Sequence, residues 1–410
     1  MRVLIVSTPI ANHFLPLVPL AWALRAAGHE VMVLGQPDVL RSVRAGGQTT
    51  VTVGELFNCD DMLLNGLGEE ERPLQVRPRP AREVLGGYGR LWMFHAKAVF
   101  ARYLEYAEAY RPELIIADPL EYCSLIMGTV LDVPVVHHRW SVDEISGVAR
   151  RSIRPDLQEL CDSLGVPALP DPDLLIDPCP PSLQVPGVEQ GVPIRYLPFS
   201  GSGQQPDWLW ERRAPGGPRR VAVSLGNTLE LNGAPFTRRL LHALAAVPDT
   251  EIVATVGAEH RAQIGEVPAQ VRMIDPLPLQ LLLGSADVMV HHGGSGTAMS
   301  GSYFGLPQLT LPQLTDHFAM GDRLTAVGVG LTFQEAAQQD DPAVVGGALE
   351  ELLTNPGYRA AARELAAEIH RMPSPARVAA DLEQLALEQL PPDRPAPARA
   401  AGVGAPERGE

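Results

Sequence analysis

The sequence predicts an α/β protein made of two halves, each built on a parallel β-sheet. Short apolar runs alternate with segments of helical spacing in both halves of the chain, and a proline-rich stretch lies between them. The length of 410 residues also favours two cores over one, because a single core rarely grows beyond about 250–300 residues. We place the first half at 1–200, a linker at 201–218 and the second half at 219–375.

The first half begins with a strand–helix–strand unit. Residues 2–6 form an apolar strand, the helical spacing of 17–27 ends at Gly28, and residues 30–34 form a second strand. This order is typical of the βαβ unit of a parallel sheet. The turn at 7–13 lacks Gly-x-Gly-x-x-Gly, which disfavours a dinucleotide-dependent dehydrogenase.

The alternation continues through the rest of the first half. A long helix is expected at 88–110, and further strands at 50–53, 113–119 and 133–138. The polar stretch 65–82 is expected to form a surface loop. Many prolines between 165 and 218 give that stretch the composition of an interdomain linker.

The second half repeats the same alternation of strands and helices. Its strand candidates are 220–225, 251–256, 271–275, 287–291 and 307–311. Its helix candidates are 235–246, 278–284, 297–304, 317–326, 357–370 and 376–389. The C-terminal helix, bounded at 376–390, can pack back onto the first half. The proline- and alanine-rich tail at 391–410 is expected to be disordered.

Composition and charge disfavour several classes of partner. The net charge of −15 argues against nucleic acid and anionic membranes, because both bind clustered basic residues. The four cysteines have no Cys-x-x-Cys spacing, so neither a disulfide scaffold nor a thiolate metal site is indicated. The N-terminus has no signal-peptide pattern, and no apolar run reaches the roughly 18–20 residues that span a bilayer. We therefore expect a soluble, cytoplasmic protein.

An anion-binding turn is predicted at residues 286–300. An apolar strand runs into two histidines, a glycine turn follows at 293–296, and a helix starts near Thr297. Glycine lets the backbone approach a phosphate closely, and the first N–H groups of a helix have no partner within it. The one lysine of the chain, Lys97, lies far from this turn, so the site cannot be a P-loop. Glycines that only turn a tight corner are the alternative.

Motifs along nearly the whole chain resemble those of one enzyme family. They are His13-Phe14-Leu15-Pro16-Leu17, Arg111-Pro112-Glu113-Leu114-Ile115 ahead of Asp118, Arg195-Tyr196-Leu197-Pro198-Phe199, the glycine turn, and Gly305-Leu306-Pro307-Gln308 followed by Asp316-His317. In this order they resemble the nucleotide-sugar-dependent family 1 glycosyltransferases of the GT-B fold, in the bacterial branch that attaches deoxysugars to antibiotics. The resemblance implies two Rossmann-like α/β domains facing each other across a cleft, with the donor bound by the second domain and the acceptor by the first.

The resemblance also implies where the donor diphosphate binds. Its site would consist of His292, Gly294, Ser295, Gly296 and Thr297. Adjacent residues of a strand face opposite ways, so His291 and His292 cannot both reach the phosphate, and the family motif selects His292. Gly226 and Asn227, at the end of the first strand of the second half, would face the same diphosphate.

The base and the sugar of the donor have their own candidate residues. The base would lie against Pro276 and Leu277, where the family often has a stacking aromatic residue, and both TDP and UDP stay open as donor nucleotides. Asp316 and His317 match the family pair that holds sugar hydroxyls. For Asp316 the alternative is an N-cap of the helix that starts near His317.

The candidate catalytic pair is His13 and Asp118. His13 lies just beyond the first strand and matches the general base of the family, and Asp118 would orient its ring. The alternatives are a structural histidine and an ordinary Asp-Pro turn. Helix amides and His292 would stabilise the leaving diphosphate, so no metal is required. An Asp-x-Asp at 171–173 lies in a proline-rich loop and is interpreted as chance. One in-line displacement would invert the anomeric centre.

The predicted function is transfer of a deoxysugar from a TDP-sugar to a hydroxyl of a polyketide-like or other apolar secondary metabolite. Candidate walls of the acceptor pocket are Trp92, Phe94 and Trp140, and a core position is the alternative for each. Two other functions stay open. One is a nucleotide-sugar 2-epimerase, which needs no acceptor. The other is a non-catalytic sugar-nucleotide-binding partner of another transferase, against which His13 with Asp118 argues. A homodimer and a requirement for an auxiliary activator protein both stay open.

Overall fold

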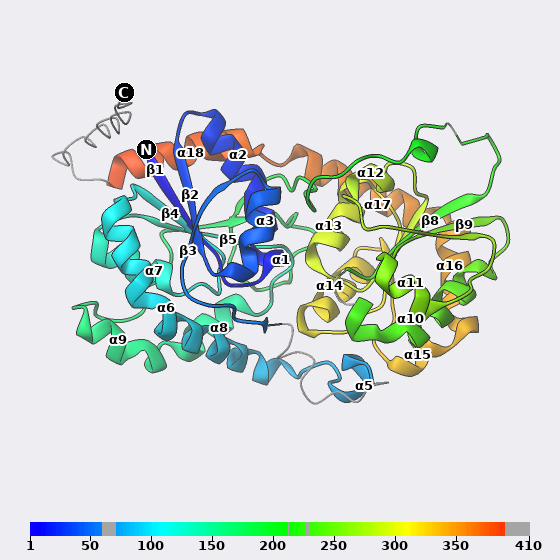
Figure 1. The fold of residues 1–410 in the computed structure, drawn as a ribbon, viewed down its shortest axis with the longest axis horizontal. Coiled ribbons are helices and arrows are strands. Elements are labelled where there is room, and N and C mark those ends of the chain that lie inside the picture. Colours follow the sequence, from blue (N-terminus) through cyan, green and yellow to red (C-terminus); the bar gives the residue numbers. More distant parts are fainter. Residues whose placement is uncertain (60–70, 212, 227–228, 390–410) are drawn as a thin grey trace, which may run out of the picture.

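The computed structural model describes residues 1–59, 71–211, 213–226 and 229–389. It contains two sheets that lie side by side along the long axis of the molecule, each flanked by helices (Figure 1). Every strand pair in these ranges is parallel. The predicted α/β architecture of two parallel sheets is therefore confirmed.

The first sheet has the strand order β3-β2-β1-β4-β5-β6-β7. Its strands are β1 (Arg2–Val6), β2 (Glu30–Gly35), β3 (Thr49–Thr52), β4 (Leu114–Ala117), β5 (Val135–His138), β6 (Leu174–Asp177) and β7 (Val192–Pro193). Side chains of β1 alternate between two cores, because successive residues of a strand face opposite sides of a sheet. Leu4 and Val6 belong to one hydrophobic cluster, and Val3 and Ile5 belong to the other.

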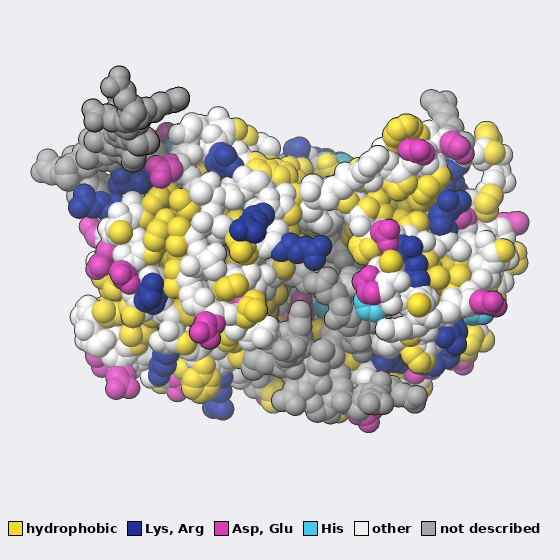
Figure 2. Space-filling view, viewed as in Figure 1, with side chains coloured by type: hydrophobic (Ala, Val, Ile, Leu, Met, Phe, Trp, Pro, Cys, Tyr) yellow, Lys and Arg dark blue, Asp and Glu magenta, His cyan; other side chains and the backbone are white. Residues whose placement is uncertain are grey.

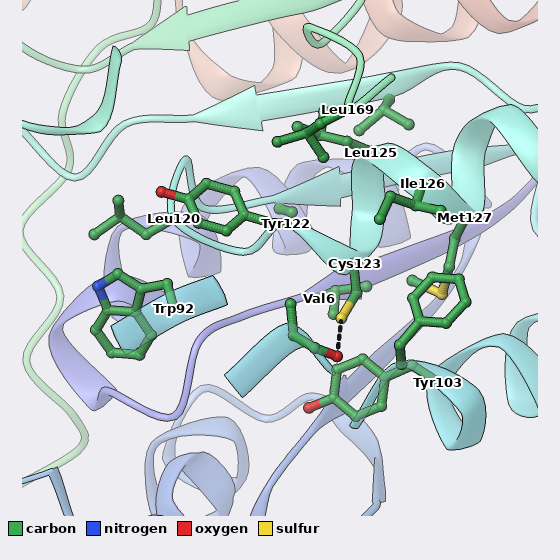
Figure 3. Packing of buried hydrophobic residues seen from close by; sticks show 14 of the residues in the cluster. Val6, Trp92, Tyr103, Leu120, Tyr122, Cys123, Leu125, Ile126, Met127 and Leu169 are labelled. Carbon is green, nitrogen blue, oxygen red and sulfur yellow. Dashed lines mark hydrogen bonds between the residues drawn. The ribbon is translucent and has the colours of Figure 1, made fainter. Parts of the chain in front are cut away.

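Helices cover both faces of the first sheet. They are α1 (Ala11–Phe14), α2 (Val18–Ala26), α3 (Leu40–Ala45), α5 (Pro73–Val76), α6 (Gly89–Tyr110), α7 (Cys123–Leu131), α8 (Ser146–Ile153) and α9 (Gln158–Ser163). The long helix α6 buries residues at spacings of three and four, from Trp92 through Ala96, Phe100 and Tyr103 to Ala107. This is the pattern of an amphipathic helix on a core. Figure 3 shows Trp92 of this helix on the side of Leu120 and Tyr122, and Tyr103 below Cys123 at the start of α7.

The second sheet has the strand order β10-β9-β8-β11-β12-β13. Its strands are β8 (Arg219–Ser224), β9 (Thr250–Thr255), β10 (Val271–Ile274), β11 (Val288–His291), β12 (Gln308–Thr310) and β13 (Gly330–Thr332). The helices are α10 (Leu229–Ala245), α11 (Ala258–Ile264), α12 (Gln280–Leu283), α13 (Ser295–Tyr303), α14 (Thr315–Ala326), α15 (Ala336–Asp340), α16 (Pro342–Thr354), α17 (Pro356–Arg371) and α18 (Pro375–Gln389). The central strand β11 is buried throughout, as expected of a parallel sheet with helices on both faces.

The main departure from the sequence prediction lies in residues 165–218. Strands β6 and β7 fall within this stretch and extend the first sheet. β6 has only four residues, so its pattern does not stand out among the surrounding prolines. The prediction also missed β13 and helices α11, α15 and α16. The Gly346-Gly347 pair inside α16 obscures it, because glycine is a poor helix former.

The C-terminal helix α18 leaves the second half and packs on the first. Val378, Ala379 and Leu382 of α18 belong to the same cluster as Val3 and Ile5. The helix lies against α2 (Figure 1). α18 is thus tied to the first strand and second helix of the chain, and this contact helps to hold the two sheets relative to each other.

No helix within the described ranges is both long and apolar enough to cross a bilayer. On the face shown in Figure 2, basic and acidic side chains are interspersed over both halves of the molecule.

We predict that Leu382→Ala lowers the free energy of unfolding by about 2–5 kcal/mol, because a fully buried leucine leaves a cavity when truncated. Leu387 lies on the same helix and is 67% exposed, so Leu387→Ala is the matched control and should change that free energy by less than about 0.5 kcal/mol. Urea unfolding followed by circular dichroism measures both variants. Equal effects would contradict the docking of α18.

Candidate active site

The candidate base and its carboxylate meet at one edge of the first sheet. His13 lies beyond β1 on the short helix α1, and Asp118 follows β4. The parallel register pairs Val6 with Ala117, so the segments after both strands leave the sheet together. As a result His13 Nδ1 lies 3.3 Å from Asp118 Oδ1.

Thr8 joins His13 and Asp118 into one network, and the sequence analysis missed it. Its Oγ1 lies 2.8 Å from His13 Nδ1 and donates to Asp118 Oδ2 at 3.0 Å. Its backbone N–H donates to the same oxygen at 2.7 Å, and the N–H of Leu120 donates to Oδ1 at 3.1 Å. The sequence signal was only a hydroxyl residue in the turn between β1 and His13.

This network decides which nitrogen of His13 can act as a base. An ionised Asp118 only accepts hydrogen bonds, and Thr8 gives its single hydroxyl hydrogen to Asp118. The Nδ1 atom of His13 must therefore be the donor, and Nε2 is the nitrogen without a proton in the neutral ring. Thr8 and Asp118 thereby select the tautomer of His13.

Asp118 stays ionised although it is fully buried. Burial by itself raises its pKa, but the hydrogen bond and charge of His13, with the N–H groups of Thr8 and Leu120, lower the pKa below its ordinary value. The carboxylate is therefore available to stabilise a protonated His13.

Two tryptophans lie beside the imidazole of His13. Trp140 stacks on it with ring centroids 4.4 Å apart and planes 7° apart, and Trp92 lies tilted at 6.1 Å. Both indoles are buried, so they belong to the core and also border the base. An indole face attracts a cation, so the stack favours the protonated ring that arises when His13 accepts a proton.

The structure does not bring Phe94 to this group. Phe94 is 66% exposed, and it lies two residues from Trp92 on α6, which is about 200° around a helix. It therefore faces away from His13 and does not join the two tryptophans, and its place in the acceptor pocket stays a prediction. Phe57 lies nearer, with its ring 6.0 Å from that of Trp92.

The two histidines before the glycine turn face opposite ways, as strand alternation predicts. His291 Nε2 lies 2.8 Å from the side-chain amide of Gln308, and its Nδ1 accepts the N–H of Gly293 at 3.0 Å. His292 Nδ1 lies 3.5 Å from the carbonyl oxygen of Ser224, and its ring meets that of His317 edge-on at 4.9 Å. His291 is thus held inside the sheet layer, and His292 faces α14.

Gly226 and Gly294 enclose the ring of His292. A Cβ atom on Gly226 would lie 2.6 Å from this ring, and one on Gly294 would lie 2.2 Å from it. Gly226 also has a φ of 56°, which favours glycine. Glycine is required at both positions because the imidazole fills the space, so these residues do more than turn a corner.

The N-terminus of α13 opens toward the same turn. The helix starts at Ser295, and the N–H of Ala298 makes its first bond, to Gly294 O at 3.0 Å. The N–H groups of Ser295, Gly296 and Thr297 precede the first bond of the helix and have no partner within it. Together with the helix dipole they form a site for an anion.

The histidines around this turn are neutral near pH 7. Burial lowers the pKa values of His291, His292 and His317 to about 3 each, and the charge of a neighbouring histidine adds to each shift. His292 can therefore offer a hydrogen bond, but no fixed positive charge, to an anion at α13.

Asp316 does not cap a helix. α14 begins at Thr315 with Leu314 as its N-cap, so Asp316 lies in the first turn. Burial raises its pKa, and its own backbone N–H together with the nearby His13 and His292 opposes that shift. Because His13 belongs to the first half and His292 to the second, Asp316 lies where the two halves face each other. The Nδ1 atom of its neighbour His317 is buried and has no hydrogen-bond partner within the described ranges.

The loop predicted to hold the base lies between β10 and α12. Pro276 is exposed there, and Leu277 packs against the same small cluster as Trp208 of the linker. The linker runs over this loop at Trp208, and Ser200, the residue before the linker, accepts the N–H of Leu279 with its Oγ at 3.0 Å. Asn227, the remaining predicted donor contact, lies outside the described residues.

The Asp-x-Asp at 171–173 is engaged in the fold of the first half. Asp171 pairs with Arg150 at 2.9 Å and with Arg154 at 2.5 Å. Asp173 Oδ2 accepts the N–H of Val135 at 2.8 Å. In the part of the chain that the structure describes, no three His, Cys, Asp or Glu side chains gather as metal ligands.

Comparison with known proteins links this geometry to one group of enzymes. The family described as erythromycin biosynthesis protein CIII-like matches with its N-terminal domain at residues 22–226 and with its C-terminal domain at residues 238–385. The L-demethylnoviosyl transferase of Streptomyces niveus is 35% identical over 95% of this chain and 98% of its own length.

Solved structures of glycosyltransferases are similar to this chain over both of its halves. The spinosyn rhamnosyltransferase SpnG complexed with thymidine diphosphate has a TM-score of 0.84 and 33% identity, covering 93% of this chain and 100% of SpnG. SpnG has also been solved with spinosyn aglycone. The glycosyltransferase VinC in complex with DTDP has a TM-score of 0.79 and 30% identity, covering 95% of this chain and 100% of VinC.

We predict that Asp118→Asn destabilises the protein in a pH-dependent way. Because the folded-state pKa of Asp118 lies below the unfolded value near 3.9, the ionised form adds stability above that value, and this stability is lost as the pH falls through the folded pKa. The difference in free energy of unfolding from wild type should be largest at about pH 6–8 and shrink below about pH 4. Asp156→Asn, at an exposed position, is the control. A pH-independent difference would contradict the role of the ionised carboxylate.

Proposed function

Because the chain belongs to the erythromycin biosynthesis protein CIII-like family of GT-B glycosyltransferases, we propose that it transfers a deoxysugar from a TDP-linked donor to a hydroxyl of an apolar secondary metabolite. One observation carries the proposal. His13 of the Asp118–Thr8–His13 network and His292 beside α13 both lie close enough to Asp316 to lower its pKa, which supports an active site between the two halves.

Family membership itself determines the fold and the enzyme class. The predicted GT-B fold and glycosyltransferase activity are confirmed by relatives that match over nearly the whole chain. The two alternatives, a nucleotide-sugar 2-epimerase and a non-catalytic partner, are set aside because the relatives are transferases.

The diphosphate of the donor would bind at the N-terminus of α13. The N–H groups of Ser295, Gly296 and Thr297 would donate to its oxygens. Neutral His292 would add one more donor as its Nε2–H tautomer, which gives up the 3.5 Å contact of Nδ1 with Ser224 O. As the bond to the sugar breaks, negative charge grows on the diphosphate, and these fixed dipoles stabilise it. Thymidine is supported as the nucleoside because both SpnG and VinC bind its diphosphate.

The base and the sugar of the donor would lie on opposite sides of the glycine turn at 293–296. Pro276 and Leu277 offer an apolar surface to the base, under the linker. Asp316 would accept hydrogen bonds from sugar hydroxyls, and it lies close enough to His13 for a protonated His13 to lower its pKa. This arrangement would place C1 of the sugar between the leaving diphosphate and the base.

His13 would act as the general base of a single displacement. The acceptor oxygen attacks C1 while its proton passes to Nε2 of His13. The bond between C1 and the diphosphate oxygen breaks, and its electron pair leaves with TDP. Asp118 and the face of Trp140 stabilise the imidazolium, and one in-line displacement inverts C1.

The acceptor is proposed to be apolar because tryptophans border the base. Trp92 and Trp140 lie on two sides of His13, and Phe57 extends this aromatic surface. The spinosyn aglycone bound by SpnG supports a natural-product acceptor of this kind.

We predict that TDP raises the thermal unfolding midpoint more than UDP or GDP does, since a ligand at 100 times its Kd stabilises the folded state by about 2.7 kcal/mol. Gly294→Ala should remove most of this shift, because a Cβ atom would displace the His292 ring. Gly347→Ala is the matched control, because a Cβ atom there has nothing within 4 Å. Stabilisation by none of the three nucleotides would refute the donor site.

We predict that His13→Gln lowers kcat by about 10²- to 10⁴-fold, the usual contribution of a general base. Thr8→Val should lower kcat by about 10- to 100-fold, because it removes the hydroxyl that orients His13. Thr8→Ser keeps that hydroxyl and is the matched control. TDP release from a TDP-deoxysugar in the presence of an aglycone panel measures turnover. Full turnover by His13→Gln would refute general-base catalysis by His13.

A further inference from the structure

A segment of the first half reaches across to the second half. This segment, residues 72–79, follows β3 in the chain and is called the strap here. It contains α5, which Figure 1 shows near α14 and α15 of the second half. Side chains at both ends of the strap bond to the second half, so it bridges the two halves.

Arg72 is the first anchor of the strap and is only 2% exposed. Its Nη1 donates to Gln339 Oε1 at 3.0 Å, and its Nη2 donates to Asp340 Oδ2 at 2.8 Å. Its guanidinium carbon lies 4.0 Å from the centre of the Phe236 ring. Two directed hydrogen bonds and a ring contact at once need a planar guanidinium, which lysine cannot reproduce.

Gln339 connects this anchor to the loop before Asp316. Gln313 Nε2 donates to the same Gln339 oxygen at 2.7 Å, and Gln339 Nε2 donates to Pro312 O at 3.0 Å. Pro312 and Gln313 lie between β12 and α14, and Asp316 lies in the first turn of α14. A chain of contacts therefore runs from Arg72 in the first half to the proposed sugar-binding residue of the second.

Arg79 is the second anchor of the strap and binds α14 itself. Its Nη1 lies 2.5 Å from Asp322 Oδ2 and donates to Gln334 Oε1 at 3.2 Å. Arg79 thus bonds to the helix whose first turn carries Asp316, and Arg72 reaches the loop before that helix through Gln339. They do not contact His292 or α13, where the diphosphate is proposed to bind.

We propose that Arg72 is a positioning residue for the sugar part of the donor. It holds the loop at Pro312 and Gln313 through Gln339, and so places Asp316 only when the strap joins the two halves. The inference rests on the proposed donor site and extends it. Binding of the sugar, but not of the diphosphate, is coupled to contact between the halves.

Truncation of Arg72 leaves its partners satisfied. Asp340 keeps its ion pair with Arg239 at 2.9 Å. Gln339 keeps its bonds to Gln313 and Pro312, but it loses the bond that fixes it and this loop to the first half. The variant is therefore expected to fold. Arg239 is 49% exposed and binds the same carboxylate from within the second half, so Arg239→Ala is the matched control.

Calorimetric titration with TDP and with TDP-L-rhamnose tests the proposal. For Arg72→Ala we expect the affinity for TDP-L-rhamnose to fall about tenfold, within the roughly 5- to 150-fold range of coupling between sites. The affinity for TDP should stay within about twofold. Arg72→Lys should recover only part of the loss, Arg79→Ala should show a smaller loss of the same kind, and Arg239→Ala should bind both ligands as wild type does.

Three outcomes would overturn the proposal. An equal loss for TDP and TDP-L-rhamnose would show a general structural role, and no loss for either would show that Arg72 positions nothing. A loss of acceptor affinity alone would make the strap part of the acceptor site. Failure of the wild type to bind TDP is a different result, because it would refute the proposed donor site itself. If Arg72→Ala does not fold, Arg79→Ala gives the same comparison.

Discussion

Parallel pairing places every loop that carries a proposed catalytic or donor residue at the carboxyl edge of its sheet. β1 and β4 pair in register, so Thr8, His13 and Asp118 leave the first sheet together. β8 and β11 pair in the same way, so Gly226 and His292 leave the second sheet together. In an antiparallel pair the two loops would leave opposite edges and could not meet. The proposed catalytic and donor side chains can therefore meet only because the strands that precede them pair in parallel.

Burial has opposite consequences at the two sites. Asp118 is buried with partners that donate to it, so it stays ionised and can support a proton on His13. At the glycine turn of the second half, burial lowers the pKa values of His291, His292 and His317, so these three histidines are neutral near pH 7. A leaving diphosphate brings its own negative charge, and fixed N–H dipoles can hold it and then release it to water more readily than a permanent ion pair would. In the proposed mechanism the first half thus accepts a proton, and the second half binds the diphosphate anion.

Contacts at several places hold these sites face to face. α18 packs on α2, and Tyr196 Oη, from the segment before the linker, donates to Gly296 O at 3.0 Å. The strap adds Arg72 and Arg79 on the second half. Ser200, the residue before the linker, accepts a hydrogen bond from Leu279 in the loop that follows Pro276. Reaction between a donor and an acceptor that bind to different halves requires such contacts, because the attacking oxygen and C1 must come within about 3–3.5 Å of each other.

The sequence by itself determined the two parallel-sheet halves, the glycine turn and the pairing of His13 with Asp118 as candidates. These follow from apolar periodicity, from glycines next to a helix start and from the order of short motifs, all of which are local. Only the tertiary structure decided that Thr8 orients His13, that Phe57 and not Phe94 lies near Trp92, that Asp316 is not an N-cap, and that residues 165–218 add strands to the first sheet. The hydrogen bond from Arg72 to Gln339 is also seen only in the tertiary structure. Each of these depends on the direction of a side chain or on a contact between residues far apart in the chain, and no local pattern of residues encodes either one.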